Sequence, residues 1–211
     1  QGEKQMEYIV SLTSREKPEV MVVSSVYPVS ETEIGILEEE CEHLLLLDHN
    51  HKEMLISHGI PSYLSYDRAA SIVAARHLFK GKGCTLVDFG TTLSVDFISA
   101  EGLYLGGNIS LGFRTRFKAV NRYSRALPLV EIPSSPEMTG HSETSSIESG
   151  VVAGIIFEME GYLGLYPENI AVFTGGDANY FAKRMKSSIF AICNLVLMGL
   201  ALMAEEDVRK N

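Results

Sequence analysis

The chain has 211 residues, 45% of them hydrophobic, which is enough for one large globular domain or two small ones. Its formal net charge of −9 argues against a nucleic-acid-binding protein, which normally has a basic face, but not against binding a nucleotide in a local loop. The three cysteines are far apart and the longest apolar run is too short to span a membrane, so we expect buried free thiols and a cytoplasmic protein without a membrane partner.

The first third of the chain predicts alternating strands and helices. A β-branched apolar run at 19–26 is typical of a buried strand. Ser30, followed three residues later by Glu33, is a capping-box signature, and the apolar spacing after it predicts an amphipathic helix. The run at 44–49 predicts a second short strand, and the stretch at 50–66 is typical of a loop.

A second helix is predicted to open at Asp67, and three short strands joined by hairpin-type connections follow it. These strands are expected at Cys84–Asp88, Leu93–Ile98 and Leu103–Asn108. The later expected elements are a helix from 113, a loop at 128–140, a closely packed helix at 146–163, a strand at 169–174, and helices at 177–186 and 194–208. Hairpins mixed with crossover helices predict an α/β architecture with a mixed sheet.

Two glycine turns stand at predicted strand ends, "VDFGTT" at 87–92 and "VFTGGD" at 172–177. In such turns backbone N–H groups point at a common spot with no Cβ in the way, and they bind phosphate oxygens. Asp88 lies at the same place and is suited to holding a cation. The alternative is purely structural, two tight turns capped by Asp88 and Asp96, and the residues alone leave both interpretations open.

The segment "SYDRAA" places Asp67 and Arg68 at a predicted helix start. One interpretation is structural, with Asp67 as the N-cap. The functional interpretation is an aspartate kept ionised by the helix dipole, which accepts a proton from a hydroxyl group. Arg68 would then meet a carboxylate as a two-point fork.

The order of "YDR.A", "VDFGT", "YLGGNIS.G", "ESGVV.G" and "TGGDA" along the chain resembles the type III pantothenate kinases, members of the acetate and sugar kinase, Hsp70 and actin superfamily. The resemblance covers about residues 22–200. It implies two ribonuclease-H-like halves with mixed sheets flanked by helices, here expected at 1–80 and 81–211. It also implies a homodimer with the substrate pocket near the dimer interface.

The resemblance implies ATP-dependent phosphorylation of pantothenate to 4'-phosphopantothenate, the first step of coenzyme A biosynthesis, with Mg²⁺ as a cofactor. Asp67 takes the position of the catalytic proton acceptor, and Asp88 that of the ligand for a monovalent cation, K⁺ or NH₄⁺. The implied substrate-binding positions are His58, Ser65, Tyr66, Asp67, Arg68, Glu143 and Thr144. The implied ATP-binding positions are Gly90, Thr91, Thr92, Gly175 and Gly176.

Four positions depart from the family pattern: Ser65 replaces glycine, Leu111 proline, His58 tyrosine and Glu143 threonine. The family's first phosphate element, "Asp-x-Gly-Asn-Thr", has no counterpart. We therefore interpret residues 1–10 as the tail of a hairpin, and we expect a longer polypeptide with residues before Gln1 and between 10 and 16. The alternative function is a non-catalytic, accessory-factor-like protein of the same family that is linked to transcription.

Overall fold

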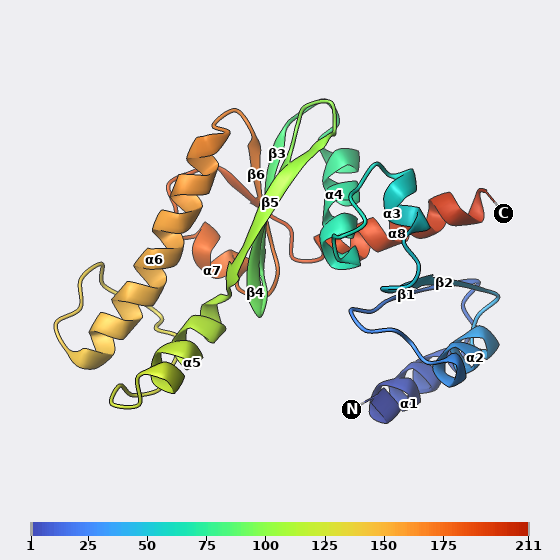
Figure 1. Cartoon of the computed structure of the whole chain (residues 1–211), viewed down its shortest axis with the longest axis horizontal. Coiled ribbons are helices and arrows are strands. Elements are labelled where there is room, and N and C mark those ends of the chain that lie inside the picture. The colour runs from blue at the N-terminus through green and yellow to red at the C-terminus, as the bar shows by residue number, and fades with distance from the viewer. Residues whose placement is uncertain (1, 211) are drawn as a thin grey trace. The chain divides into compact units, whose positions relative to one another are not determined.

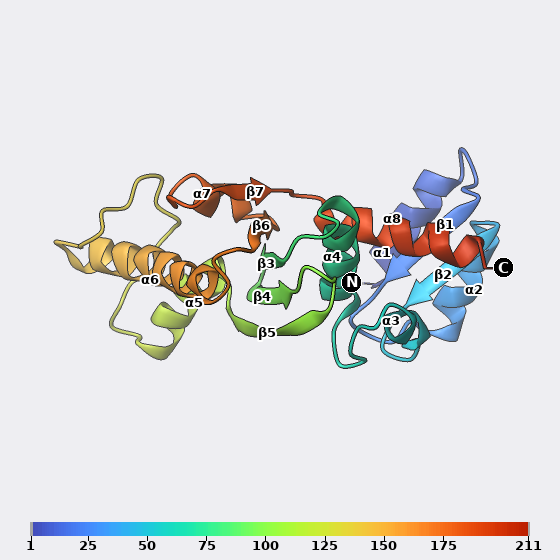
Figure 2. The ribbon, with the colours of Figure 1, turned by 90° about the horizontal axis from the view of Figure 1, so that it is seen from above.

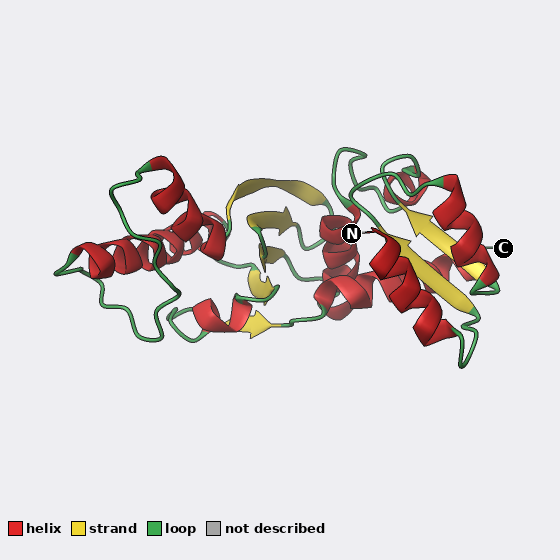
Figure 3. Cartoon of the chain, turned by 90° about the horizontal axis from the view of Figure 1, so that it is seen from below, coloured by secondary structure: helices red, strands yellow, loops and turns green. Residues whose placement is uncertain are grey.

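The structure is a computed structural model that describes residues 2–210, and it divides into two compact units. Unit 1 holds the chain up to Ala74 together with the stretch from Val196 onward, and unit 2 is Ala75–Leu195. Each unit has its own sheet, drawn yellow in Figure 3. The functional halves expected at 1–80 and 81–211 stay a prediction. The division into compact units differs from them, because the last helix belongs to unit 1.

Unit 1 is built on a two-stranded parallel sheet, in which Val20 pairs with His43. Its elements are α1 (Gly2–Thr13), β1 (Val20–Ser24), α2 (Glu31–Glu39), β2 (His43–Leu47), α3 (Glu53–Ser57), the start of α4 (Tyr66–Leu78), and α8 (Leu195–Val208). Parallel strands need a crossover connection, and α2 supplies it. The predicted capping box is confirmed, because Ser30 Oγ accepts from the Glu33 N–H and Glu33 Oε2 accepts from the Ser30 N–H.

Helices lie on both faces of the unit 1 sheet, with α1 and α2 on one side and α8 on the other (Figure 1). Helices α8 and α4 approach closely at one point. A Cβ at Gly199 would lie 1.9 Å from the carbonyl oxygen of Ala70, so only glycine permits this contact. The two helices therefore form a fixed pair beside the carboxyl ends of β1 and β2.

Unit 2 is built on a five-stranded mixed sheet with the order β5-β4-β3-β6-β7, which Figure 2 shows nearly end-on. Its strands are β3 (Cys84–Phe89), β4 (Thr92–Ile98), β5 (Tyr104–Leu111), β6 (Ile170–Thr174) and β7 (Ile189–Ala191). β3 pairs antiparallel with β4 and parallel with β6. Three antiparallel strands extended by two parallel ones form a ribonuclease-H-like sheet, and the predicted α/β class with mixed sheets is confirmed.

One face of the unit 2 sheet packs against α5 (Phe113–Tyr123), α6 (Glu143–Leu165) and α7 (Ala178–Ala182) (Figure 1). Side chains alternate along a strand, so Val87 and Phe89 of β3 enter this core. The carboxylate of Asp88 therefore belongs to the opposite face, at the carboxyl end of the central strand.

The interpretation of the first ten residues as a hairpin tail is wrong for the described part, because residues 2–13 form α1. Gln1 lies outside the described residues. Met6, Ile9, Val10 and Thr13 are half-buried at helical spacing, and this periodicity determines the conformation.

Smaller differences from expectation concern short elements and burial. The expected loop at 50–66 contains α3, and β7 has no counterpart among the predicted strands. Helix α6 is closely packed along Val151, Ala153 and Ile155, while a Cβ at Gly150 would meet no atom of the described residues within 4 Å. Cys41 and Cys84 are buried as expected, but Cys193 is exposed. Over residues 2–210 no helix is both long and apolar enough for a bilayer crossing.

Candidate active site

The two glycine turns lie side by side in unit 2. Asp88, at the end of β3, is the parallel register partner of Thr174, at the end of β6. Gly175 follows with a φ of +88°, a conformation that L side chains rarely adopt. A Cβ there would stand 2.4 Å from Asp88 Oδ1 and 2.7 Å from the carbonyl oxygen of Phe89. The close approach of the two turns therefore depends on a glycine at this position.

The first turn is tied to the start of α5. The Thr91 carbonyl oxygen accepts hydrogen bonds from the Gly112 N–H at 3.0 Å and from Thr115 Oγ1 at 2.7 Å. A Cβ at Gly112 would lie 2.1 Å from the Gly90 carbonyl oxygen, so this contact also needs glycine. The turn itself is exposed at Gly90, Thr91 and Thr92. The positive end of the α5 dipole thus lies beside an exposed glycine turn, a setting that favours anions.

The second turn, Gly175 to Asp177, leads into α7. The Asp177 N–H donates to the Phe89 carbonyl oxygen at 3.4 Å, which joins this turn to the first one. Arg114, in the first turn of α5, lies 3.5 Å from Asp177 Oδ1. Gly176 is exposed, and a Cβ added there would meet no atom of the described residues within 4 Å, so the outer side of the turn is open.

An aromatic cluster stands behind both turns. Phe89 stacks on Phe181 of α7 with ring centres 5.0 Å apart, and it contacts Phe173 at 4.9 Å. Phe113, directly after Gly112, meets Phe181 edge-on at 4.9 Å. Buried aromatic rings of this kind hold a precise geometry, so the backbone of the turns rests on a rigid base.

Asp88 and Thr174 together suit a cation. Thr174 Oγ1 is buried, and among the side chains described, those of residues 6–210, it has no hydrogen-bond partner. Its register pairing with the half-buried Asp88 puts both side chains on one face of the sheet. A carboxylate and an unsatisfied hydroxyl oxygen are ligands that hard cations prefer. Sequence reasoning included Thr174 in the second glycine turn but did not connect it with Asp88, because that proximity comes from strand pairing.

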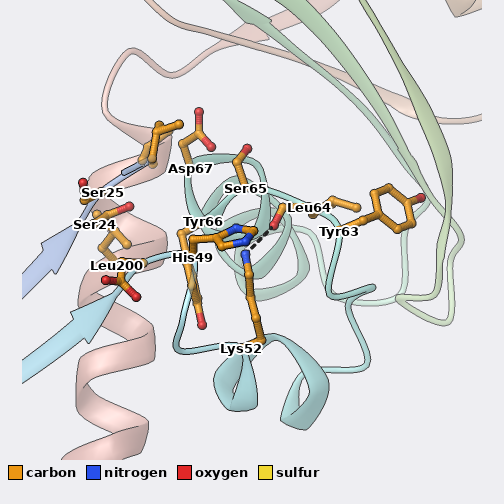
Figure 4. Close-up of a pocket in the computed structure, with 13 residues that line it drawn as sticks. Ser24, Ser25, His49, Lys52, Tyr63, Leu64, Ser65, Tyr66, Asp67 and Leu200 are labelled. Atoms are coloured by element: carbon orange, nitrogen blue, oxygen red, sulfur yellow. Dashed lines mark hydrogen bonds between the residues drawn. The ribbon is translucent and has the colours of Figure 1, made fainter. Parts of the chain in front are cut away.

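A cavity of about 420 Å³ lies in unit 1, outside the carboxyl ends of β1 and β2 (Figure 4). Open α/β sheets bind ligands at this edge. It is lined by Ser24, Ser25, Val26, Asp48, His49, Lys52, Tyr63, Leu64, Ser65, Tyr66, Asp67, Val196 and Leu200. The exposed Asp67 belongs to the first turn of α4, which begins one residue earlier at Tyr66. This boundary does not support Asp67 as the residue that caps the helix from outside.

Two buried groups shape the floor of the cavity. The Tyr66 hydroxyl donates to the His51 carbonyl oxygen, and burial, helped by the nearby carboxylates of Glu53 and Asp48, raises its pKa to about 12. Asp48 is 1% exposed, and burial acts to raise the pKa of its carboxyl group. Hydrogen bonds from the His51 ring and from backbone N–H groups outweigh burial, so this pKa is lowered. Asp48 is thus an ionised structural anchor.

The predicted substrate-binding residues fall into separate places. Ser65, Tyr66 and Asp67 line the cavity, and the half-buried Arg68 follows them in α4. His58 instead pairs through Nε2 with Glu206 Oε2 of α8 at 3.0 Å. Glu143 and Thr144 are exposed in the first turn of α6, in unit 2. The predicted ATP-binding residues all lie at the two glycine turns described above. Lys52, which belongs to no motif, also lines the cavity.

The mixed sheet and its paired glycine turns define a protein with the ribonuclease-H-like fold of actin and the sugar kinases. The chain is similar to a Campylobacter jejuni protein assigned to the Baf family of transcriptional activators, with a TM-score of 0.59, 22% identity and coverage of 86% of this chain and 81% of the other. It is also similar to ROK hexokinase from Thermus thermophilus, with a TM-score of 0.52, 12% identity and coverage of 99% and 88%. At these identities the likeness shows the fold alone.

Sequence relatives identify the family within this class. Residues 2–164 match the family model described as type III pantothenate kinase. The type III pantothenate kinase of Cytophaga hutchinsonii is 38% identical over 197 residues, which cover 91% of this chain and 83% of the relative. That of Phocaeicola vulgatus is 39% identical over 184 residues, covering 85% and 76%. The chain belongs to the type III pantothenate kinase family.

Proposed function

We propose that this protein transfers the γ-phosphoryl group of ATP to the primary hydroxyl group of pantothenate and so forms 4'-phosphopantothenate, the first intermediate of coenzyme A biosynthesis. The observation that carries the proposal is the position of Asp67. In a chain of this family, an exposed carboxylate in the first turn of α4 lines a cavity at the carboxyl ends of parallel strands.

Asp67 is suited to orient a hydroxyl group and to take its proton late in the transfer. The dipole of α4 favours its ionised form, since the residue lies in the first helical turn. Phosphoryl transfer depends mostly on positioning and charge neutralisation. The main requirement at the acceptor hydroxyl group is therefore a base that aligns it for attack. Ser65 and Tyr66 bound the cavity beside it and hold the substrate in place.

The glycine turns of unit 2 are the proposed ATP phosphate site. Gly90, Thr91 and Thr92 are exposed, and backbone N–H groups with threonine hydroxyls are donors that phosphate oxygens accept. The nearby start of α5 adds the favourable end of its dipole. Arg114 at the second turn contributes positive charge.

The proposed cations fit this part of the molecule. Asp88, with the buried hydroxyl of Thr174, is suited to K⁺ or NH₄⁺ beside the phosphate turns. Bound Mg²⁺ supplies neutralisation of the charge on the ATP phosphates. The two glycine turns would position the ATP phosphates next to these cations.

The proposal includes a homodimer. The exposed face of edge strand β5 carries Leu105, Ile109 and Leu111, which are 47%, 60% and 48% exposed. Apolar side chains along an edge strand are unusual on a monomer surface, which supports a covering partner. Glu143 and Thr144, which the family resemblance assigns to substrate binding, would in this proposal reach the substrate from the second subunit. A cytoplasmic location remains part of the proposal.

The test is product formation from purified protein, ATP, Mg²⁺, K⁺ and pantothenate, followed by mass spectrometry of 4'-phosphopantothenate and by ADP release. We expect ADP release that requires pantothenate. Pantothenate-independent ADP release, or none, under these conditions contradicts the proposal and favours the non-catalytic, transcription-linked alternative.

A further inference from the structure

An ion-pair network in unit 2 joins the start of α5 to β5 and α6, three elements that lie together in Figure 1. Arg116, one turn into α5, forms an ion pair through Nη2 with Glu158 Oε2 of α6. The same nitrogen donates to Ser110 Oγ of β5 at 3.1 Å, and the Ser110 hydroxyl group donates to Glu158 Oε1 at 2.7 Å. The side chains of Arg116 and Glu158 are only 21% and 20% exposed, so water screens their attraction less than that of a surface pair.

Arg116 also holds the backbone at the junction between β5 and α5. Its Nε donates to the Leu111 carbonyl oxygen at 2.8 Å, and its backbone N–H donates to the Gly112 carbonyl oxygen at 2.9 Å. A guanidinium group is planar and rigid, so the directions of its Nε and Nη2 donors are fixed relative to each other. Glu158 therefore controls, through Arg116, where the Leu111 carbonyl group lies.

The junction at Leu111 and Gly112 supports the first glycine turn. Leu111 pairs with Thr92 in the register of β4 and β5, and Gly112 donates its N–H to the Thr91 carbonyl oxygen at 3.0 Å. The backbones are in close contact here, because a Cβ at Gly112 would lie 2.1 Å from the Gly90 carbonyl oxygen. A movement of the junction is therefore transmitted to the turn.

The network can supply geometry to the turn, but little attraction. The positive charge of Arg116 is matched within the network by the carboxylate of Glu158. Backbone N–H groups bind a phosphate well only when they converge on one point. Donors that are held in that arrangement before binding cost no rearrangement when the ligand arrives.

We propose that the Arg116–Glu158 pair is a positioning device for nucleotide binding, which fixes the first glycine turn in the conformation that receives the phosphates of ATP. The inference rests on the proposed function and adds two positioning residues to it. They act through the Leu111 carbonyl group and the Gly112 N–H, not by direct contact with a substrate. Binding of pantothenate should be independent of the pair.

The experiment measures ATP binding to the whole chain and its variants by calorimetric titration with Mg²⁺ and without pantothenate. Glu158→Gln keeps an acceptor for the Ser110 hydroxyl group and removes the charge that holds Arg116, whereas Arg116→Met removes the guanidinium group. We expect the Kd for ATP to rise about 5- to 20-fold in each variant, while the KM for pantothenate stays within about twofold of the wild type. Arg116→Lys keeps the charge without the planar fork and should recover little of the affinity.

Hydrogen exchange at the Gly112 N–H gives a readout that needs no ligand. This group bonds to the Thr91 carbonyl oxygen, and we expect it to exchange faster in Glu158→Gln and in Arg116→Met. Val152→Ala is the control for a loss of stability, because Val152 of α6 is buried in the core of unit 2 and makes none of the contacts of the network. It should lower the melting temperature without weakening ATP binding.

Two results would overturn the inference alone. Tighter ATP binding in Glu158→Gln would mean that this acid only offsets the charge of Arg116. An equal loss of ATP affinity in Val152→Ala would assign the effect to general stability. A wild-type chain that binds no ATP contradicts both the inference and the proposed function. ATP binding that depends on the pair, in a protein that does not phosphorylate pantothenate, supports the inference and contradicts the proposed function.

Discussion

Asp88 Oδ1 lies 2.4 Å from the point that a Cβ on Gly175 would occupy, so the acid of one turn fills the space left by the glycine of the other. Asp88 lies in β3 and Gly175 directly follows β6, the neighbouring parallel strand, so each turn limits the conformation of the other. A change at either position therefore acts on both turns.

Gly175→Ala should distort this pair of turns. The φ of +88° costs a non-glycine residue about 1–2 kcal/mol, and the contacts with Asp88 and Phe89 force a further displacement. We expect a lower melting temperature and weaker ATP binding, measured by thermal unfolding with and without nucleotide. Gly176→Ala is the control, because open space surrounds that position. Equal melting temperatures for both variants would show that the turn tolerates a Cβ at 175.

Asp67→Asn should abolish most of the turnover and leave folding nearly intact. The substitution preserves size and polarity in the exposed first turn of α4 and removes the proton acceptor. We expect a drop in kcat of about 100-fold or more, with a melting temperature close to that of the wild type. Glu31→Gln, an exposed acid in the first turn of α2, controls for loss of a helix-dipole interaction. Activity within a few fold of wild type would assign Asp67 to the helix alone.

Asp88→Ala should remove the dependence of activity on K⁺. The variant loses the carboxylate beside the unsatisfied Thr174 hydroxyl, and a monovalent ion needs such oxygen ligands. Rates are measured in K⁺, NH₄⁺ and Na⁺ at constant ionic strength. A wild-type protein that is equally active in Na⁺ and K⁺ contradicts a cation role for Asp88.

Only Cys193 should react with a thiol reagent in the native state. It is exposed, whereas Cys41 and Cys84 are buried. Burial raises the pKa of Cys41 and raises that of Cys84 to about 11, which suppresses their thiolates further. We expect one labelled thiol per native chain and three after denaturation. Cys193→Ser should abolish native labelling, and rapid modification of a second thiol would show that a buried cysteine opens.

Asp48→Asn should destabilise unit 1 in a pH-dependent manner. The pKa of Asp48 is lowered in the folded protein, so its contribution is complete above the ordinary value of an aspartate and is lost as the pH falls through the lowered value. We expect a loss of about 1–3 kcal/mol at pH 7, measured by chemical denaturation. The difference in stability between variant and wild type should narrow as the pH falls below the ordinary pKa of an aspartate, about 4. A stability difference that does not change with pH would mean that the variant is destabilised by altered packing and not by the loss of the carboxylate charge.

Local sequence signals predicted the elements that depend on local chemistry. The capping box at Ser30 and the strands flanking Gly90 were found because turn and cap residues act within a few positions of themselves. β7 and α3 escaped prediction because three and five residues are too few to show a period. For α1, the apolar residues Met6, Ile9 and Val10 do show helical spacing in the sequence. The hairpin was expected there because of the family resemblance and not because of this spacing.

The candidate site was predictable where a motif carries it, and not where the fold creates it. Asp67 and the glycine turns stand in recognisable segments, although their roles stay predictions. Thr174 lies beside Asp88 because of strand register, and Lys52 lines the same cavity as Asp67 because of tertiary packing. Neither relationship is encoded by a local motif. The split placement of His58 and Glu143 likewise follows from packing that no local pattern encodes.

The return of α8 to unit 1 sets an order for folding. Unit 2 is continuous in sequence, so it can form as soon as its own residues are available. Unit 1 needs the contact of Gly199 with Ala70, and all of unit 2 separates these residues in the chain. Closing so long a loop is slow. We therefore expect unit 2 to acquire hydrogen-exchange protection first, with the cavity around Asp67 completed last.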